Sequence, residues 1–187
     1  MTRIDAQNAE VLVFTEKEGL LSPVAHDLKI RITVFALHVD EAAGRVTATL
    51  DASSLRVVCA MKGASEEPRA LSDKDRREIE NNIRKDVLDA AAHPEIRISA
   101  ALPGGEGSVP VRVTLRGRER ELVANVRVQG DRVSVEARVH QPDFGIRPYS
   151  AMFGALKVKA DVRVVASWPA ALWFPVSEGS RSRGLPV

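Results

Sequence analysis

Apolar and charged residues alternate along much of the chain, which is the pattern of β-strands with one buried and one solvated face. In the clearest run, Leu28, Ile30, Ile32 and Val34 share one face, and charged or polar residues lie between them. Similar runs occupy residues 10–17, 46–50, 55–59, 96–100, 111–115, 122–128, 133–139 and 156–164. Turn-forming residues at 41–44, 103–107, 116–118 and 129–131 separate several of these runs. The chain is therefore expected to form about eight antiparallel strands.

One segment, residues 72–92, has helical spacing instead. Its apolar stripe consists of Ile79, Ile83, Val87 and Leu88. Ser72 is a suitable N-cap, and acidic residues follow it at the positive end of the helix. Pro94 should end the helix, because the residue before a proline avoids helical geometry. We expect one amphipathic helix within a β protein.

Strands with one apolar face need that face covered, and a sheet that closes on itself does this while removing exposed edges. An eight-stranded barrel has room for packed side chains or for one small ligand. A two-sheet sandwich would produce much the same alternation. The expected domain covers residues 1–167, followed at 168–187 by a tail with three prolines and the apolar anchors Trp168, Trp173 and Phe174.

Composition narrows the functional classes. The chain of 187 residues is 44% hydrophobic but only 4% aromatic, so its interior must be built mainly from Val, Ile, Leu and Ala. Its 27 basic and 25 acidic residues are interspersed, which argues against nucleic-acid binding. No stretch approaches the ~20 apolar residues of a transmembrane helix. No apolar core of ~7–15 residues marks a signal peptide, so a cytoplasmic location is expected.

Candidate catalytic and metal-binding groups are sparse. The histidines at 38, 93 and 140 share no ligand-like spacing, and Cys59 stands alone, so no metal site is expected. His26 and Asp27 are adjacent on a strand, and their side chains therefore face opposite ways. The serines lack the motif of a nucleophile elbow. The chain is not expected to be an enzyme, and Cys59 is expected to be a small buried side chain.

Several segments, in this order, resemble the YceI-like family of lipocalin-like, polyisoprenoid-binding proteins. They are AHDLKIRITVF at 25–35, DVLDAAAHPEIRISA at 86–100, VTLRGRERELVANV at 113–126, DFGI at 143–146 and the final alternating run at 156–164. The resemblance covers about residues 10–166. The chain departs from the family pattern at Asp27, where Ser is common, at Glu119, where Thr is usual, and at Gln141-Pro142, which precede DFGI in place of Arg.

The resemblance implies an all-β, extended, eight-stranded lipocalin-like barrel with a helix near one end and an elongated apolar cavity. It implies a long isoprenoid or similar lipid as ligand, often an isoprenoid quinone, and often a homodimer. No cofactor is expected apart from such a bound isoprenoid lipid or quinone. The expected function is that of a carrier, scavenger or store for such a molecule. The alternative is an interaction protein with a solid barrel and no ligand.

The inward-facing residues form the expected ligand site. Recurring alanines on this face either leave room for a ligand or fill a tapering solid core. His26 either donates a hydrogen bond to a ligand headgroup at the barrel mouth or is structural. The segment around Phe144 is either a core plug or a flexible gate. The expected ligand-binding residues are His26, Leu28, Ile30, Ile32, Ala48, Ile98, Leu115, Ala124, Val135, Ala137, Phe144, Met152, Phe153 and Val158.

Overall fold

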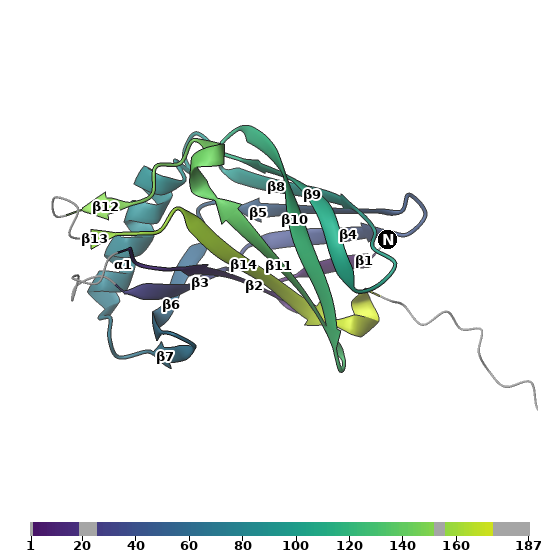
Figure 1. Ribbon diagram of the computed structural model, residues 1–187, viewed down its shortest axis with the longest axis horizontal. Helices are drawn as coiled ribbons and strands as arrows, with labels where there is room; N and C mark the ends of the chain where they lie inside the picture. The colour runs from purple at the N-terminus through teal and green to yellow at the C-terminus, as the bar shows by residue number, and fades with distance from the viewer. Residues whose placement is uncertain (1, 19–25, 152–155, 174–187) are drawn as a thin grey trace, which may run out of the picture.

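In this computed structural model, twelve strands among the described residues form one antiparallel sheet that curls round toward a barrel (Figure 1). The structure describes residues 2–18, 26–151 and 156–173. The hydrogen-bonded order is β1-β4-β5-β8-β9-β10-β11-β14-β2-β3-β6-β7. Three short connections, at residues 6–9, 33–34 and 52–54, join β1 to β2, β3 to β4 and β5 to β6. These connections hold the two ends of the sheet together, and the sheet is therefore barrel-like.

The elements have the following bounds. The strands of the large sheet are β1 (Thr2–Asp5), β2 (Glu10–Thr15), β3 (Asp27–Ile32), β4 (Phe35–Asp40), β5 (Arg45–Asp51), β6 (Leu55–Lys62), β7 (Ser65–Glu67), β8 (Glu95–Ala101), β9 (Gly107–Leu115), β10 (Arg118–Gln129), β11 (Arg132–His140) and β14 (Asp161–Pro169). A small second sheet pairs β12 (Ser150–Ala151) with β13 (Leu156–Lys157). The helical segments are α1 (Asp73–Asn82), η1 (Ile83–Val87), η2 (Gln141–Phe144) and η4 (Ala170–Leu172).

The expected all-β, barrel-like fold with one α-helix is confirmed, but the expected count of about eight strands is too low. One reason lies between β3 and β4, where the apolar face changes from even to odd residue numbers. Thr33 and Val34 form the bend, and the Thr33 hydroxyl donates to the carbonyl of Ser54 over 2.8 Å. Val34 is 57% exposed, so its expected place on the apolar face is wrong. The alternation ends at the bend and resumes with Phe35.

The helix begins as the sequence predicts. The Ser72 hydroxyl accepts from the backbone N–H of Asp75, and the Asp75 carboxylate accepts from the backbone N–H of Ser72, which together form a capping box. The helix continues as one π-helical turn through η1 and ends before Asp89, whose φ is +48°. The N–H of Ala90 then donates to the carbonyl of Arg84. The expected end at residue 92 is therefore wrong, because this C-terminal turn stops the helix earlier.

The final strand also lies further along the chain than expected. Residues 158–160 separate β13 from β14, so the predicted continuous strand over 156–164 is wrong. The buried Gln141 of η2 is the cause. Its backbone N–H donates to the carbonyl of Ala160 and its side-chain amide donates to the carbonyl of Lys159. Those two carbonyls are thus taken up by the turn that follows β11.

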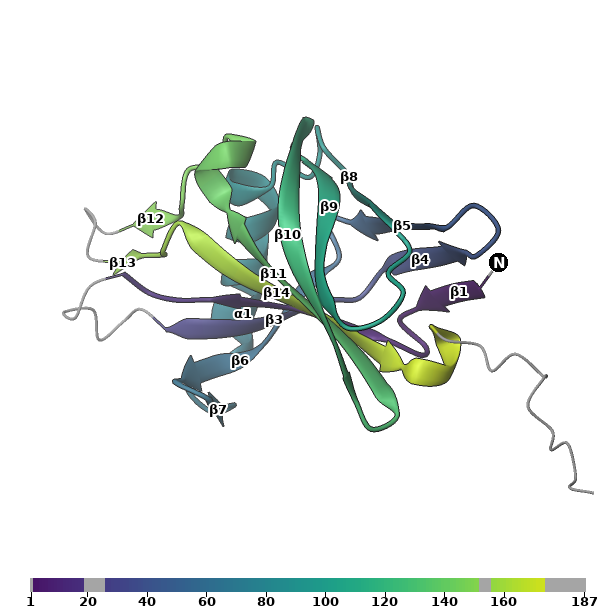
Figure 2. The same cartoon turned by 45° about the vertical axis from the view of Figure 1, so that its right-hand side comes forward.

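The buried apolar side chains form two clusters. The helix-end cluster is centred on buried residues of β3, β6, β9 and η2, and Ile79, Ile83 and Val87 of the helical segment pack against it. The tryptophan-end cluster consists of Ile4, Val39, Val46, Val126, Val133, Trp168 and Trp173. The rings of Trp168 and Trp173 lie 5.0 Å apart between centroids. Figure 1 places the helix and the η4 turn at opposite ends of the sheet, and Figure 2 shows from a second side that the helix lies behind the sheet, so each end has its own cluster.

Candidate functional site

The inner face of the barrel carries a band of small aliphatic side chains at the edge of the helix-end cluster. Strand pairing places Ala124 opposite Ala137, Ala137 opposite Val164, and Val164 opposite Val13. Ala124 is buried, whereas Ala137, Val164 and Val13 remain half-buried although they face inward. We refer to these four residues as the central band.

The two clusters are almost separate. Among the described residues, only Ala166 packs against both of them. A domain of this size usually has one contiguous core. Within the central band, Val13 and Val164 pack against the helix-end cluster, whereas Ala124 and Ala137 belong to neither cluster. The central band therefore lies along the boundary at which the two clusters are discontinuous.

Most of the predicted ligand-binding residues lie on the inner face. Leu28, Ile30, Ile32, Leu115 and Phe144 are buried in the helix-end cluster, and half-buried Ala48 and Ile98 pack against it. Val135 packs against the tryptophan-end cluster, while Ala124 and Ala137 belong to the central band. Met152 and Phe153 lie outside the described residues. The fold thus places the described aliphatic members of the predicted site, apart from Val158, on the inner face of the barrel.

Two predicted site residues belong to neither the two clusters nor the central band. His26 is half-buried immediately before β3 and lies near Asp75 in the first turn of α1, so it lies at the helix end. Val158 forms an isolated bridge with Lys17, and its N–H donates to the carbonyl of Tyr149. It therefore belongs to the extension that leads to β12 and β13, beyond the end of β14.

That extension is held by ion pairs on its solvated side. The Lys159 ammonium lies beside the Glu16 carboxylate, and Lys157 pairs with Glu18 over 2.8 Å. The hydrogen bond from Lys159 holds the pKa of Glu16 below its ordinary value, and the same bond raises the pKa of Lys159. The neighbouring Thr15 faces inward, and its hydroxyl is buried with no partner among the described residues.

Two arginines that sequence reasoning missed also lie on the inward parity of the wall. Pairing of β10 with β9 places Arg118 opposite the buried Leu115 and Arg120 opposite the buried Val113. The register between β10 and β11 starts at Ala124, and beyond that point Gly145, which follows η2, lies against Arg118. Extending the alternation of residues 122–128 backwards by two steps would have found both arginines.

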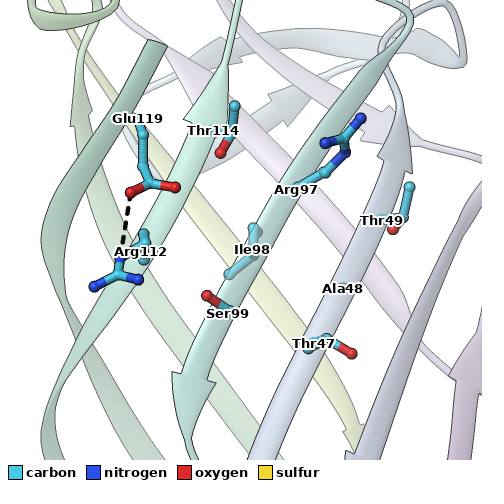
Figure 3. A pocket seen from close by; sticks show the side chains of 9 residues that line it. All are labelled: Thr47, Ala48, Thr49, Arg97, Ile98, Ser99, Arg112, Thr114 and Glu119. Atoms are coloured by element: carbon cyan, nitrogen blue, oxygen red, sulfur yellow. Dashed lines mark ion pairs between the residues drawn. The ribbon is translucent and has the colours of Figure 1, made fainter. Parts of the chain in front are cut away.

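The outer face of the same wall carries a shallow pocket of about 300 Å³ (Figure 3). Its lining is largely polar and comes from β5, β8, β9 and β10, with hydroxyl side chains beside Arg97 and Arg112. The Arg112 guanidinium lies 3.4 Å from the Glu119 carboxylate, and Arg97 pairs with Glu95 over 3.1 Å. Both ion pairs are exposed, and exposed ion pairs usually contribute little to the stability of a fold. The pocket has the character of a solvated sheet face.

The described residues contain no cluster of three or more His, Cys, Asp or Glu side chains that could hold a metal ion. Within the same ranges, no helix has the length and apolar character needed to cross a membrane. Cys59 is buried as expected, and burial raises the pKa of its thiol. The candidate site is therefore the aliphatic inner face of the barrel together with Arg118 and Arg120, which we call the basic rim.

Comparison with known proteins agrees with this architecture. The sequence model of the YceI-like domain matches residues 3–169. A polyisoprenoid binding domain from Saccharophagus degradans, implicated in plant cell wall breakdown, is similar in structure, with a TM-score of 0.56 and 13% identity over 90% of this chain and 97% of that one. BcnA from Burkholderia cenocepacia has the same TM-score and identity over 88% and 97%. Among curated proteins, none is similar enough to match.

Proposed function

This chain belongs to the YceI-like family, and we propose that it binds an apolar long-chain molecule, an isoprenoid or isoprenoid quinone, along the inside of its barrel. The proposed role is that of a carrier, scavenger or store, without chemistry on the ligand. The similarity in fold to a polyisoprenoid binding domain supports the ligand class.

The observation that carries the proposal is the division of the interior into two clusters, with Ala124 and Ala137 of the central band belonging to neither of them. Side chains that face inward in a solid barrel should be buried in one continuous core. Here Ala137, Val164 and Val13 face inward and remain half-buried. A long hydrocarbon chain lying against the band would bury them and would join the two clusters.

The chemistry of the band favours such a ligand. Its four side chains are aliphatic, and they offer a ligand no hydrogen-bonding or charged group. Burial of apolar surface contributes about 25 cal/mol per Å² and has no directionality. Affinity would then depend on how much of the chain is buried, and the length of the hydrocarbon should matter more than its detailed structure.

Native mass spectrometry of protein purified without detergent tests the proposal. We expect either a co-purified adduct of isoprenoid mass or, after incubation with a tetraprenyl benzoquinone, a one-to-one complex. A benzoquinone with a single prenyl unit is the matched control and should bind much more weakly, because it buries less apolar surface. A clean apoprotein mass with both compounds, and after incubation with fatty acids, would contradict the proposal and favour a solid barrel that serves protein interaction.

A further inference from the structure

Two arginines at the rim of the barrel, Arg118 and Arg120, bear on the chemical class of the ligand headgroup. We propose that Arg118 and Arg120 form an anion subsite, which takes the phosphate or carboxylate headgroup of an amphiphile whose chain lies against the central band. This inference rests on the proposed function, and it adds a chemical class for the polar end of the ligand.

The position of the two arginines is the first step. Arg118, Arg120, Leu122 and Ala124 alternate along one face of β10, as their pairing with β9 requires. Alternate residues of a strand lie about 6.6–6.8 Å apart, so this face runs from the exposed arginines past half-buried Leu122 to the central band. A molecule with an anionic head and an apolar chain would meet matching groups in the same order.

The Arg118 guanidinium lies close to the backbone that follows η2. Gly145, which follows η2, has a φ of +69°, and a Cβ built there would lie 2.6 Å from the Cζ atom of Arg118. The absence of a side chain at Gly145 is therefore what lets the guanidinium lie against this backbone. The residues on either side, Phe144 and Ile146, are 1% and 3% exposed and anchor that backbone in the helix-end cluster.

The charge of the two arginines is not neutralised by nearby carboxylates. Within the described residues neither forms an ion pair, whereas Arg112 on the outer face of β9 pairs with Glu119. Arg120 donates to the backbone carbonyl of Glu119 instead. Glu119 and Glu121 alternate with the two arginines along β10, so their side chains face outward. Two guanidinium groups beside an apolar interior are a suitable recognition element for an oxyanion, because their N–H groups match its geometry.

A binding titration with matched amphiphiles tests this subsite. The probes are geranylgeranyl monophosphate, geranylgeranoic acid and the neutral alcohol geranylgeraniol, which share one hydrocarbon chain. We expect the wild-type protein to bind at least one of the two anions about tenfold or more tightly than the alcohol, since hydrogen bonds to charged groups are the strong ones. The preference should shrink as salt rises. Comparison of the two anions tells phosphate from carboxylate.

The variants identify the residues responsible. Arg118→Gln should remove most of the anion preference and leave alcohol binding unchanged, and Arg120→Gln should act in the same direction. Arg118→Lys should restore only part of the preference, because a point charge replaces the planar fork. Gly145→Ala keeps both arginines but displaces the Arg118 guanidinium, and it should also reduce the preference. Arg112→Gln is the matched control on the outer face and should change nothing.

The outcomes separate this inference from the function it rests on. If the alcohol and both anions bind the wild-type protein equally, or if Arg118→Gln and Arg120→Gln keep the full preference, the subsite is refuted while the proposed function stands. A neutral quinone headgroup would then be the better candidate. If no probe binds any form of the protein, the proposed function fails and the subsite fails with it.

Discussion

A pair of matched substitutions separates a barrel with room for a ligand from a solid one. Ala137 faces inward in the central band and is half-buried, whereas Ala60 on β6 faces inward in the helix-end cluster and is 0% exposed. Replacing each with Leu adds the same atoms to the same face of the same sheet. The two changes therefore differ mainly in the space that surrounds the new side chain.

The expected effects have opposite signs. At Ala60 the added atoms overpack a filled core, which should lower the free energy of unfolding by about 1–3 kcal/mol. For a domain of this size, that corresponds to a melting temperature lower by about 2–12 °C. At Ala137 the new side chain should bury apolar surface at about 0.8 kcal/mol per methylene. Ala137→Leu should therefore leave stability unchanged or raise it by up to about 2 kcal/mol.

Thermal unfolding by circular dichroism, without ligand, measures both variants. Titration with a tetraprenyl benzoquinone then measures the ligand affinity of each variant. Ala137→Leu should weaken ligand binding by about 5- to 150-fold, the equivalent of a 1–3 kcal/mol clash. If Ala137→Leu destabilises the free protein as much as Ala60→Leu does, the band is solidly packed. The reasoning from the two clusters would then be wrong.

Three further predictions concern the framework around the site. Ser72→Ala removes the N-cap of α1 and should cost about 1 kcal/mol in a urea unfolding titration, whereas Ser72→Asp, which keeps an acceptor, should cost less. Phe144→Ala should cost about 3–5 kcal/mol in the same assay, because this side chain is 1% exposed in the helix-end cluster; a cost under 1 kcal/mol would show that the η2 turn is not part of the core. The lowered pKa of Glu16 means that its pair with Lys159 stabilises the fold above the ordinary carboxyl pKa of 4.5, and this stabilisation is lost as pH falls through the lowered value. The stability difference between wild-type protein and Glu16→Gln, followed by melting temperature from pH 7 to pH 3, should therefore shrink on acidification, and a constant difference would contradict the pairing.

The sequence predicts the elements of this fold better than their ends. Period-2 alternation identified most of the wall, because one face of each strand is buried and the other is solvated. It missed β4, since the bend at Thr33 and Val34 reverses the parity of the apolar face. The helix end was misplaced for a similar reason. Asp89 adopts a positive φ well before the proline that marked the expected boundary.

The candidate site could be predicted only in its apolar part. Alternation shows which residues face inward, so Ala124 and Ala137 were correctly expected on one face. It contains no information about the density of packing, which depends on how strands from distant parts of the chain meet. The central band is distinguished only by the burial of its individual residues in the folded chain. His26 was expected at one mouth, and the structure places it at the helix end, near Asp75.

The arginines illustrate why the polar part of the site was missed. A charged residue at an inward position looks like the end of a strand, so the alternation was read as starting at Leu122. Strand β10 in fact extends to Arg118, and it continues past the point where its register with β11 starts. Because η2 and Gly145 lie beside this extension, the two charged side chains keep their contact with water while sharing a face with the apolar interior. An inward-facing charge at the rim of an apolar barrel is costly to bury and inexpensive to leave at the mouth. The position of Arg118 and Arg120 at the rim is therefore consistent with recognition of a ligand headgroup. The ion pair of Arg112 with Glu119 lies on the outer face, away from the apolar interior, and is not placed to meet that headgroup.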